Sequence, residues 1–215
     1  MKVKVKAVIF DFGHVLSLPP RSENMAWLAE HCGLGREEFV RAFHELRSEV
    51  DRGTLPVTEF WTQMARRGGR TPSGQLLRAM EERDLEAWTQ PNPAMFAWAE
   101  RLRQGGWKTA ILSNMPPGFL PYLEKHFPEV SRFQPAMFSC RVGMVKPEPG
   151  IYRLCLERLD LPAAQTLFLD DLAVNVAAAR SLGIHALQFH TVEASAERLV
   201  EQFELPEIEP LRVRG

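Results

Sequence analysis

The sequence has few cysteines, no long apolar run and almost no net charge, and each of these absences excludes a class of protein. The three cysteines, Cys32, Cys140 and Cys155, include no CxxC pair, so neither a disulfide framework nor a zinc cluster is expected. No run approaches the roughly 18 apolar residues that a membrane-spanning helix needs. Lys and Arg number 26 against 27 Asp and Glu, a net charge of −1, which argues against nucleic acid as the main partner.

The apolar run near the N-terminus is also short. It stops at Asp11 and is too short for the apolar region of a secretory signal peptide. Together with the unpaired cysteines, which suit a reducing compartment, this predicts a cytoplasmic protein. The 215 residues are 45% hydrophobic and 25% charged, which is the mixture of an ordinary globular protein of one or two domains.

Short runs rich in Val, Ile, Leu and Phe alternate with segments of helical periodicity along much of the chain. The runs predict strands at 6–10, 108–113, 136–140, 166–170 and 184–189. The periodic segments predict helices at 94–103, 116–126, 151–159, 174–182 and 193–203. Strands that alternate with helices imply βαβ units, a mostly parallel sheet and helices on both faces. The predicted fold class is therefore α/β, a three-layer sandwich around a Rossmann-like sheet.

A different pattern fills residues 21–86, between the first and second predicted strands. Apolar residues recur there at helical spacing, glycines interrupt them, and strand-like alternation is almost missing, so about four short helices are expected. Pro91-Asn92-Pro93 ends this segment. We therefore expect residues 1–16 and 93–215 to form an α/β core domain, with residues 17–92 inserted as a helical cap domain.

Polar side chains of four groups fall at or just after the carboxyl ends of predicted strands. In chain order they are Asp11, Ser113 with Asn114, Lys146, and Asp170 with Asp171. Ligands of an open parallel sheet bind outside these strand ends, so the side chains are expected to converge. Carboxylates hold Mg²⁺ through oxygen, a lysine and a hydroxyl–amide pair hold phosphate oxygens, and one carboxylate can attack phosphorus. A single Asp at a strand end more often caps a turn, but four such groups in this order indicate phosphoryl chemistry.

These residues lie in four short motifs: IFDFGHVL (9–16), ILSN (111–114), GMVKP (143–147) and FLDD (168–171). The set resembles the motifs of the haloacid dehalogenase-like (HAD) hydrolase superfamily, and the resemblance covers nearly the whole chain. The predicted helical insertion lies where subclass I members of the superfamily carry a small helical cap. Gly13 in the first motif resembles a branch that includes sugar-1-phosphate phosphatases.

The resemblance implies a role for each matched residue. Asp11 is expected to be the nucleophile and a Mg²⁺ ligand, and Lys146 to balance its charge and that of the phosphoryl group. The other expected metal ligands are the backbone carbonyl of Gly13 and the carboxylates of Asp170 and Asp171, with Asp170 acting through water.

Further expectations from the resemblance concern the substrate and partners. Ser113, Lys146 and the backbone near Asn114 are expected to bind phosphate, and Asn175 to order the loop of the fourth motif. The implied cofactor is Mg²⁺ and the implied partner is a small phosphorylated molecule, with no nucleic acid or membrane. A monomer or a homodimer is expected.

One position departs from the pattern of most phosphatases in the superfamily. They carry a second aspartate, a general acid and base, two residues after the nucleophile, where this chain has Gly13. General acid–base catalysis contributes ~10²–10⁴-fold, and its loss hurts most when the leaving alkoxide is basic. We therefore expect a phosphatase that favours anomeric, aryl or acyl phosphates. His14 is a candidate replacement acid; the alternative is that it packs locally.

Two other functions stay open from the sequence. A catalytically weak regulatory or binding protein on this scaffold is one, because the second acid is missing. A metal-independent 2-haloacid dehalogenase is the other, although the pair Asp170-Asp171 argues for a metal. A phosphomutase fits less well, since it must return the phosphoryl group with an acid–base residue. Trp27 and Trp61 are candidates to line a substrate cavity, with helix packing as the alternative.

Overall fold

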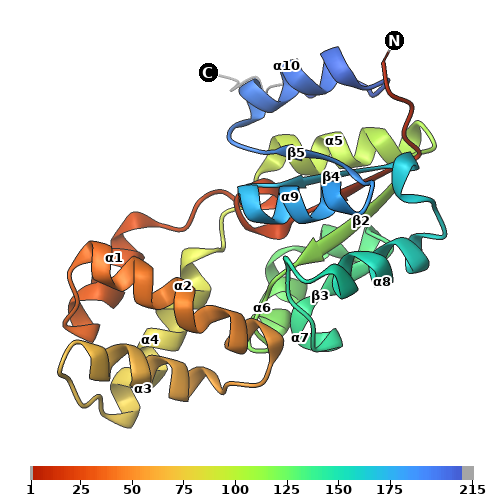
Figure 1. Cartoon of the computed structure of the whole chain (residues 1–215). Helices are drawn as coiled ribbons and strands as arrows, with labels where there is room; N and C mark the ends of the chain where they lie inside the picture. The colour runs from red at the N-terminus through yellow and green to blue at the C-terminus, as the bar shows by residue number, and fades with distance from the viewer. Residues whose placement is uncertain (1, 210–215) are drawn as a thin grey trace, which may run out of the picture.

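The computed structural model describes residues 2–209 of the chain. Within them, five parallel strands form one sheet in the order β3-β2-β1-β4-β5 (Figure 1). The strands are β1 (Ala7–Phe10), β2 (Lys108–Ser113), β3 (Ala136–Phe138), β4 (Thr166–Asp170) and β5 (His185–Gln188). Central β1 pairs with β2 on one side and with β4 on the other. The predicted α/β fold with a parallel Rossmann-like sheet is confirmed.

Helices cover both faces of the sheet, because alternate strand residues point to opposite sides. Val8 and Phe10 face one hydrophobic cluster, and Ala7 and Ile9 face the other. The first cluster is closed by α5 (Pro93–Gln104), α6 (Phe119–His126) and α10 (Val192–Gln202). The second is closed by α8 (Pro149–Leu159) and α9 (Ala173–Ser181). Burial on both faces explains why the strands read as continuous apolar runs rather than alternating ones.

Four helices lie between β1 and β2, as the periodicity of residues 21–86 predicts. We call them the cap helices: α1 (Ser22–Cys32), α2 (Arg36–Arg52), α3 (Val57–Arg67) and α4 (Gly74–Ala87). They pack around a hydrophobic cluster of their own and stand apart from the sheet in Figure 1. Gly33 and Gly53 end α1 and α2 with φ of 74° and 85°, a conformation that other residues adopt only at a cost. The division of the chain at residues 17 and 92 stays a prediction.

The third strand is shorter than the sequence predicts. It ends at Phe138, and Ser139 begins the short helix α7 (Ser139–Val142). The Ser139 hydroxyl accepts a hydrogen bond from the Met115 amide (2.9 Å) and donates one to the Asp51 carbonyl of α2 (2.5 Å). This side chain therefore joins two core loops to a cap helix, and the chain turns away from the sheet to make that contact.

A second contact joins the same end of α2 to the core. The Arg52 guanidinium donates to both carboxylate oxygens of Glu148 (3.1 and 2.5 Å) and to the Gly143 carbonyl (3.1 Å). Gly143 and Glu148 flank Lys146 in sequence, so the end of α2 is fixed to the loop that carries this lysine.

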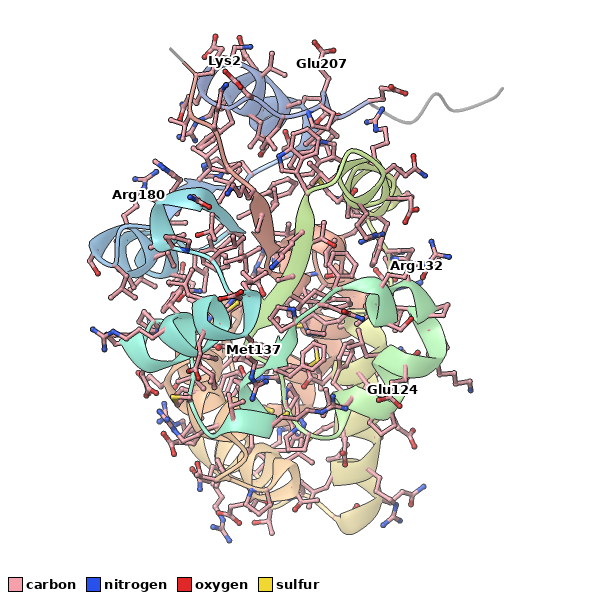
Figure 2. The ribbon with its side chains drawn as sticks, turned by 90° about the vertical axis from the view of Figure 1, so that its right-hand side faces the viewer. Lys2, Glu124, Arg132, Met137, Arg180 and Glu207 are labelled. Carbon is pink, nitrogen blue, oxygen red and sulfur yellow. The ribbon has the colours of Figure 1, made fainter. Side chains whose placement is uncertain are left out.

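The remaining elements are short. They are the wide turn η1 (Phe12–Leu16) and the single-turn helices η2 (Pro128–Arg132) and η3 (Ala163–Gln165). Figure 2 shows labelled charged residues such as Lys2, Arg132 and Arg180 at the periphery, whereas Met137 of β3 lies inside. Among residues 2–209, no helix is both long and apolar enough to cross a membrane.

Candidate active site

The strand order places the candidate site at a topological switch point. The chain leaves β1 toward β2 on one side of the sheet, whereas β4 and β5 lie on the other side. Ligands of such sheets bind in the crevice where the strand order reverses. Asp11 follows β1 and Asp170 ends β4, and the Asp11 amide donates to the Leu169 carbonyl (2.9 Å). The two carboxylates therefore project from neighbouring strands at this crevice.

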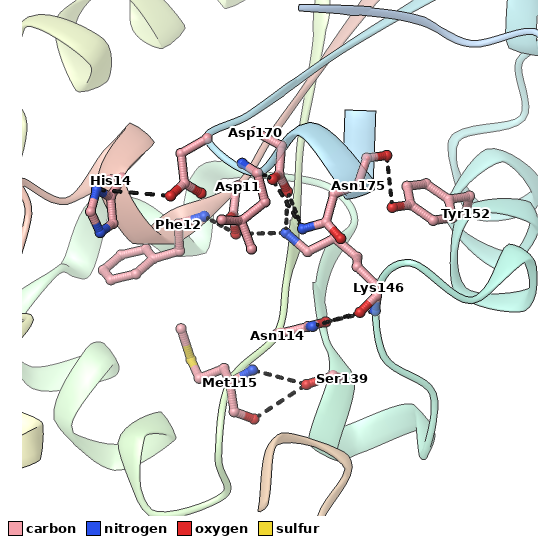
Figure 3. A network of polar contacts seen from close by, with 12 residues as sticks. Asp11, Phe12, His14, Asn114, Met115, Ser139, Lys146, Tyr152, Asp170 and Asn175 are labelled. Carbon is pink, nitrogen blue, oxygen red and sulfur yellow. Dashed lines mark hydrogen bonds and ion pairs between the residues drawn. The ribbon is translucent and has the colours of Figure 1, made fainter. Parts of the chain in front are cut away.

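The Lys146 ammonium lies between these two carboxylates. Its Nζ is 2.9 Å from Oδ1 of Asp11 and 2.7 Å from Oδ2 of Asp170 (Figure 3). Burial raises the pKa of Asp11, and the charges of Asp170 and Asp171 raise it further, whereas Lys146 opposes the rise. Burial would lower the pKa of Lys146, but the two carboxylates outweigh it and raise this pKa above its ordinary value. The lysine is therefore held charged against the candidate nucleophile.

Asp170 is completely buried, and both of its carboxylate oxygens accept hydrogen bonds. Oδ1 accepts hydrogen bonds from the Leu172 amide (2.8 Å) and from Asn175 Nδ2 (3.0 Å), and Oδ2 accepts from Asn175 (3.1 Å) as well as Lys146. The Asn175 carbonyl accepts from the Tyr152 hydroxyl (3.1 Å). Asn175 thus ties the loop after β4 to α8, which is the geometric basis for its predicted role in ordering this loop.

The carboxylates of Asp11, Asp170 and Asp171 fit a divalent cation. Each offers an oxygen, and these oxygens lie within 4.8 Å of one another. Three carboxylates and one ammonium leave two negative charges in excess, and hard oxygen donors of this kind are what Mg²⁺ takes. Burial also raises the pKa of Asp171, against the opposing effect of His14, so a cation beside Asp171 would stabilise its charged form. The metal ligands predicted from the sequence are therefore brought together, with Gly13 beside them on the wall of the same cavity.

Asn114 uses its side chain on the backbone of Lys146. Its Nδ2 donates to the Lys146 carbonyl (3.0 Å), and its Oδ1 accepts from the Lys146 amide (2.8 Å). The amide group therefore positions the lysine, so a phosphate contact would fall to the Asn114 backbone. Ser113 ends β2 and lines the same cavity as Asp11 and Lys146. Its position suits a contact with a phosphate oxygen.

Gly13 and His14 lie in the turn η1 against Trp88. A Cβ at position 13 would be 3.4 Å from Cζ3 of Trp88, in van der Waals contact with the ring. His14 has a φ of 59°; its ring centre is 5.6 Å from that of Trp88, and its Nδ1 is 3.8 Å from Oδ2 of Asp171. Trp88 therefore borders the space in which a longer side chain at position 13 would lie.

A cavity of about 300 Å³ connects these core residues with helix α2. Helix α2 contributes five side chains along one face: Phe43, His44, Arg47, Ser48 and Asp51. This face was not predicted from the sequence. The spacing of Arg47, Asp51 and Phe43 places them on one side of the helix, but it does not show that this side faces the site. Trp27 and Trp61 do not line the cavity: Trp61 is buried among the cap helices, and Trp27 stacks on His31 at 3.7 Å.

Arg47 forms a second buried ion cluster, at the cap side of the cavity. Its Nε donates to Asp51 (2.9 Å) and its Nη1 donates to Asp84 of α4 (2.6 Å). The guanidinium also lies 5.0 Å from the centre of the Phe43 ring. Burial raises the pKa of Asp51, against the opposing effect of Arg47. We call Arg47, Asp51 and Asp84 the cap ion cluster.

Comparison with known proteins identifies the family. A model of haloacid dehalogenase-like hydrolases matches residues 5–183. The chain belongs to this family. The match includes the four motifs that carry Asp11, Ser113, Lys146 and Asp170, and it confirms that this HAD hydrolase has the predicted fold and is a hydrolase.

Three curated relatives of this HAD hydrolase differ in length. Acyl-CoA dehydrogenase family member 10 of Mus musculus is 28% identical over 224 residues, 90% of this chain and 19% of the mouse protein. Bifunctional epoxide hydrolase 2 of Sus scrofa is 26% identical over 218 residues, 91% of this chain and 38% of the pig protein. Sesquiterpene phosphatase astK of Aspergillus oryzae is 28% identical over 184 residues, 85% of this chain and 88% of that protein. The chain therefore spans well under half of the first two relatives and most of the third.

Solved structures share the fold of this HAD hydrolase. A HAD family enzyme from Bacteroides thetaiotaomicron superposes with a TM-score of 0.71 at 21% identity, covering 87% of this chain and 94% of that one. The same enzyme has been crystallised with magnesium and inorganic phosphate. The L-2-haloacid dehalogenase of Xanthobacter autotrophicus superposes with a TM-score of 0.65 at 23% identity, covering 94% of this chain and 85% of that one.

Proposed function

We propose that this HAD hydrolase is a Mg²⁺-dependent phosphatase that hydrolyses small phosphate monoesters through an aspartyl-phosphate intermediate. The observation that carries the proposal is the placing of Lys146 between Asp11 and Asp170, with the oxygen of Asp171 completing a set of three carboxylates. The phosphatase among its relatives and the magnesium–phosphate complex of a structural neighbour support the same class of reaction.

The two carboxylate oxygens of Asp11 have different surroundings, which suggests different roles. Oδ1 accepts from the Phe12 amide (2.7 Å) and from Lys146, whereas Oδ2 makes no hydrogen bond to the described residues. Oδ2 attacks phosphorus, the bond to the leaving oxygen breaks, and water then hydrolyses the acyl phosphate and restores the carboxylate. Mg²⁺, when bound, supplies electrostatic stabilisation of phosphoryl oxygens. Lys146 stabilises the negative charge that spreads over them, and the Ser113 hydroxyl donates to one of them.

The absence of a side chain at Gly13 restricts the kind of leaving group that the enzyme can release. Because this position has no side chain that could protonate the departing oxygen, we expect substrates whose leaving groups need little protonation, such as anomeric or aryl phosphates. His14 is the candidate acid from the sequence, and its imidazole faces Asp171 and Trp88. A ratio of kcat/KM for an aryl over a simple alkyl phosphate near one would contradict this expectation.

The deciding experiment is hydrolysis of an aryl phosphate by the purified protein, with Mg²⁺ and with a chelator, beside the Asp11→Asn variant. We expect phosphate release that requires both Mg²⁺ and Asp11. Release that persists in the chelator or in the variant would contradict the mechanism.

The missing acid favours one other function, a regulatory protein that binds a phosphorylated ligand without turnover. Binding of vanadate or phosphate to folded protein that hydrolyses nothing in a broad panel would support it. The dehalogenase alternative predicts chloride release from 2-chloropropionate in the absence of Mg²⁺, and this assay belongs in the same panel.

A further inference from the structure

Within residues 2–209, the cavity above the phosphate end has no lysine or arginine that is free for a second anion. Among the described residues that line it, Arg47 and Lys146 are the only arginine or lysine side chains. Each is already paired with two carboxylates: Lys146 with Asp11 and Asp170, and Arg47 with Asp51 and Asp84. A carboxylate or second phosphate on the leaving group would therefore meet a region with an excess of negative charge.

The walls of the same cavity are largely apolar. The core side and the linker from the cap contribute Trp88, Met115, Phe119, Leu172 and Val174, and α2 adds Phe43. Leu172 and Val174 are 45% and 56% exposed, and they are among the few large apolar side chains that the described surface leaves open to water. Exposed apolar side chains gathered at the wall of a cavity mark a place where a ligand buries apolar surface.

The polar atoms on the cap side are mostly occupied. Asp51 and Arg47 bind each other, and the guanidinium also lies against the Phe43 ring. His44 and Ser48 are the other side chains of α2 on this wall that can form hydrogen bonds. They suit a single hydroxyl or ether oxygen better than the several hydroxyls of a sugar, because each unpaired hydroxyl that is buried costs free energy.

We propose that the leaving group of the substrate is uncharged and predominantly apolar, and that it lies between Trp88, Phe119 and Val174 with its far end toward α2. This inference rests on the proposed phosphatase function and narrows it. Of the anomeric, aryl and acyl phosphates that Gly13 favours, it selects those with an apolar leaving group, such as aryl phosphates, over sugar phosphates. The second anionic group of a bisphosphate or a phosphocarboxylate is excluded by the paired state of Arg47.

The first test measures binding without turnover. Ethylphosphonate and hexylphosphonate carry a C–P bond that is not hydrolysed, and their dissociation constants can be measured by calorimetry in the presence of Mg²⁺. Each buried CH₂ group strengthens binding by about fourfold, so partial burial of the four additional groups predicts at least a tenfold tighter Kd for hexylphosphonate. Equal affinities, or no binding of either phosphonate, would overturn the proposal.

The second test isolates charge. 3-Phosphonopropionate and butylphosphonate are similar in size, and only the first carries a carboxylate at its far end. We expect at least a tenfold weaker Kd for 3-phosphonopropionate. Affinity equal to or tighter than that of butylphosphonate would show that the cavity accepts a second anion, and would overturn the proposal.

Two matched variants test whether the apolar group of the ligand contacts Val174. Val174→Ser is expected to reduce the ratio of hexylphosphonate to ethylphosphonate affinity by about threefold, because Val174 lines the cavity. Val40→Ser serves as the control, since Val40 is a comparably exposed valine (44%) that does not line it. Val40→Ser should leave the ratio unchanged. A Val174→Ser ratio equal to that of the wild type would place the apolar group elsewhere and contradict the proposal.

Hydrolysis of an aryl phosphate separates this inference from the function on which it rests. Tighter binding of hexylphosphonate by a protein that hydrolyses no aryl phosphate would support the apolar site and contradict the phosphatase. Normal hydrolysis with equal phosphonate affinities would support the phosphatase and overturn the apolar site.

Discussion

Two buried ion clusters lie on opposite sides of the same cavity, and both place one cation between two carboxylates. In the core, the ammonium of Lys146 lies between Asp11 and Asp170; in the cap, the guanidinium of Arg47 lies between Asp51 and Asp84. In the core cluster, the carboxylate of Asp171 lies beside those of Asp11 and Asp170, with oxygens of all three within 4.8 Å of one another. This third acid leaves two negative charges uncompensated, which is the charge of one divalent cation.

The clusters also differ in what their cations contact. The Arg47 guanidinium is planar and lies over Phe43; its Nε bonds Asp51 within α2, and its Nη1 joins α2 to Asp84 of α4. An arginine held in this way is well suited to pinning helices together. The Lys146 ammonium is a compact charge buried between the two carboxylates of the candidate site. Two ion clusters of similar composition can therefore have different roles, catalysis in the core and helix packing in the cap. Substitutions in each cluster can separate these roles.

The largest effect is expected from Asp11→Asn. It should lower phosphatase activity by at least about 10³-fold, because it removes the nucleophile. It should leave the Tm of the metal-free protein unchanged or higher, since burial makes the Asp11 charge unfavourable in the folded state. Phosphate release and thermal unfolding in a chelator measure the two effects.

The pH dependence of the free energy of unfolding tests whether the Asp11 charge causes the stability difference expected for Asp11→Asn. The folded pKa of Asp11 is raised above its unfolded value, so the folded state binds more protons and stability falls as pH rises between the two values. Metal-free wild type should show this contribution, and Asp11→Asn should lack it. A lower Tm for the variant at neutral pH would contradict the role assigned to burial.

The next largest effect is expected from Arg47→Met in the cap ion cluster. Removing one member of a buried ion group leaves uncompensated charges, so the free energy of unfolding should fall by about 3 kcal/mol. Replacing all three members, with Asp51→Leu and Asp84→Leu added, should restore most of this loss. Denaturant unfolding measures the free energy of unfolding of each variant. A triple variant as unstable as Arg47→Met would contradict the view that uncompensated buried charge causes the loss.

A smaller effect, on metal affinity, is expected from Asp171→Asn. The substitution removes one carboxylate charge without breaking either contact of Lys146, so the apparent Kd for Mg²⁺ should rise by roughly 10–100-fold. Magnesium titrated against aryl phosphate hydrolysis gives this value. Asp84→Asn is the control in the cap, and it should leave the magnesium dependence unchanged.

The smallest effect is expected from Asn114→Ala, which removes both hydrogen bonds to the Lys146 backbone. A displaced lysine should lower kcat by about tenfold, with a much smaller change in KM. Asn24→Ala is the matched control, since Asn24 bonds Arg83 between two cap helices and should affect stability alone. An unchanged kcat for Asn114→Ala would show that these two hydrogen bonds do not position Lys146 for catalysis.

The sheet and the position of the site could be predicted from the sequence because local signals report them. Strands buried on both faces read as apolar runs, and polar residues at their ends mark the ligand edge. The predicted end of the third strand was wrong, because Ser139 leaves the sheet to bond Met115 and Asp51. An apolar run in the sequence gives no sign of these two partners.

The cap side of the site could not be predicted for a similar reason. Arg47 and Asp84 are 37 positions apart and lie on different helices, so their pairing depends on how the helices pack. Trp88 borders Gly13 only because the chain returns from the cap beside the first motif. Likewise, the sequence identifies Asn114 as a site residue, but only the structure shows that both ends of its amide hold Lys146.

The attachment of α2 to the core by Ser139 and Arg52 makes this helix a lever with one fixed end. A helix of 17 residues is roughly 25 Å long, so a rotation of about 10° about that end would move the other end by roughly 4 Å. Asp51, next to the pivot, would hardly move, whereas Phe43, about two turns away, would travel farther. A rotation of the cap about this end would thus change the space around an apolar group while leaving the loop of Lys146 in register with the nucleophile.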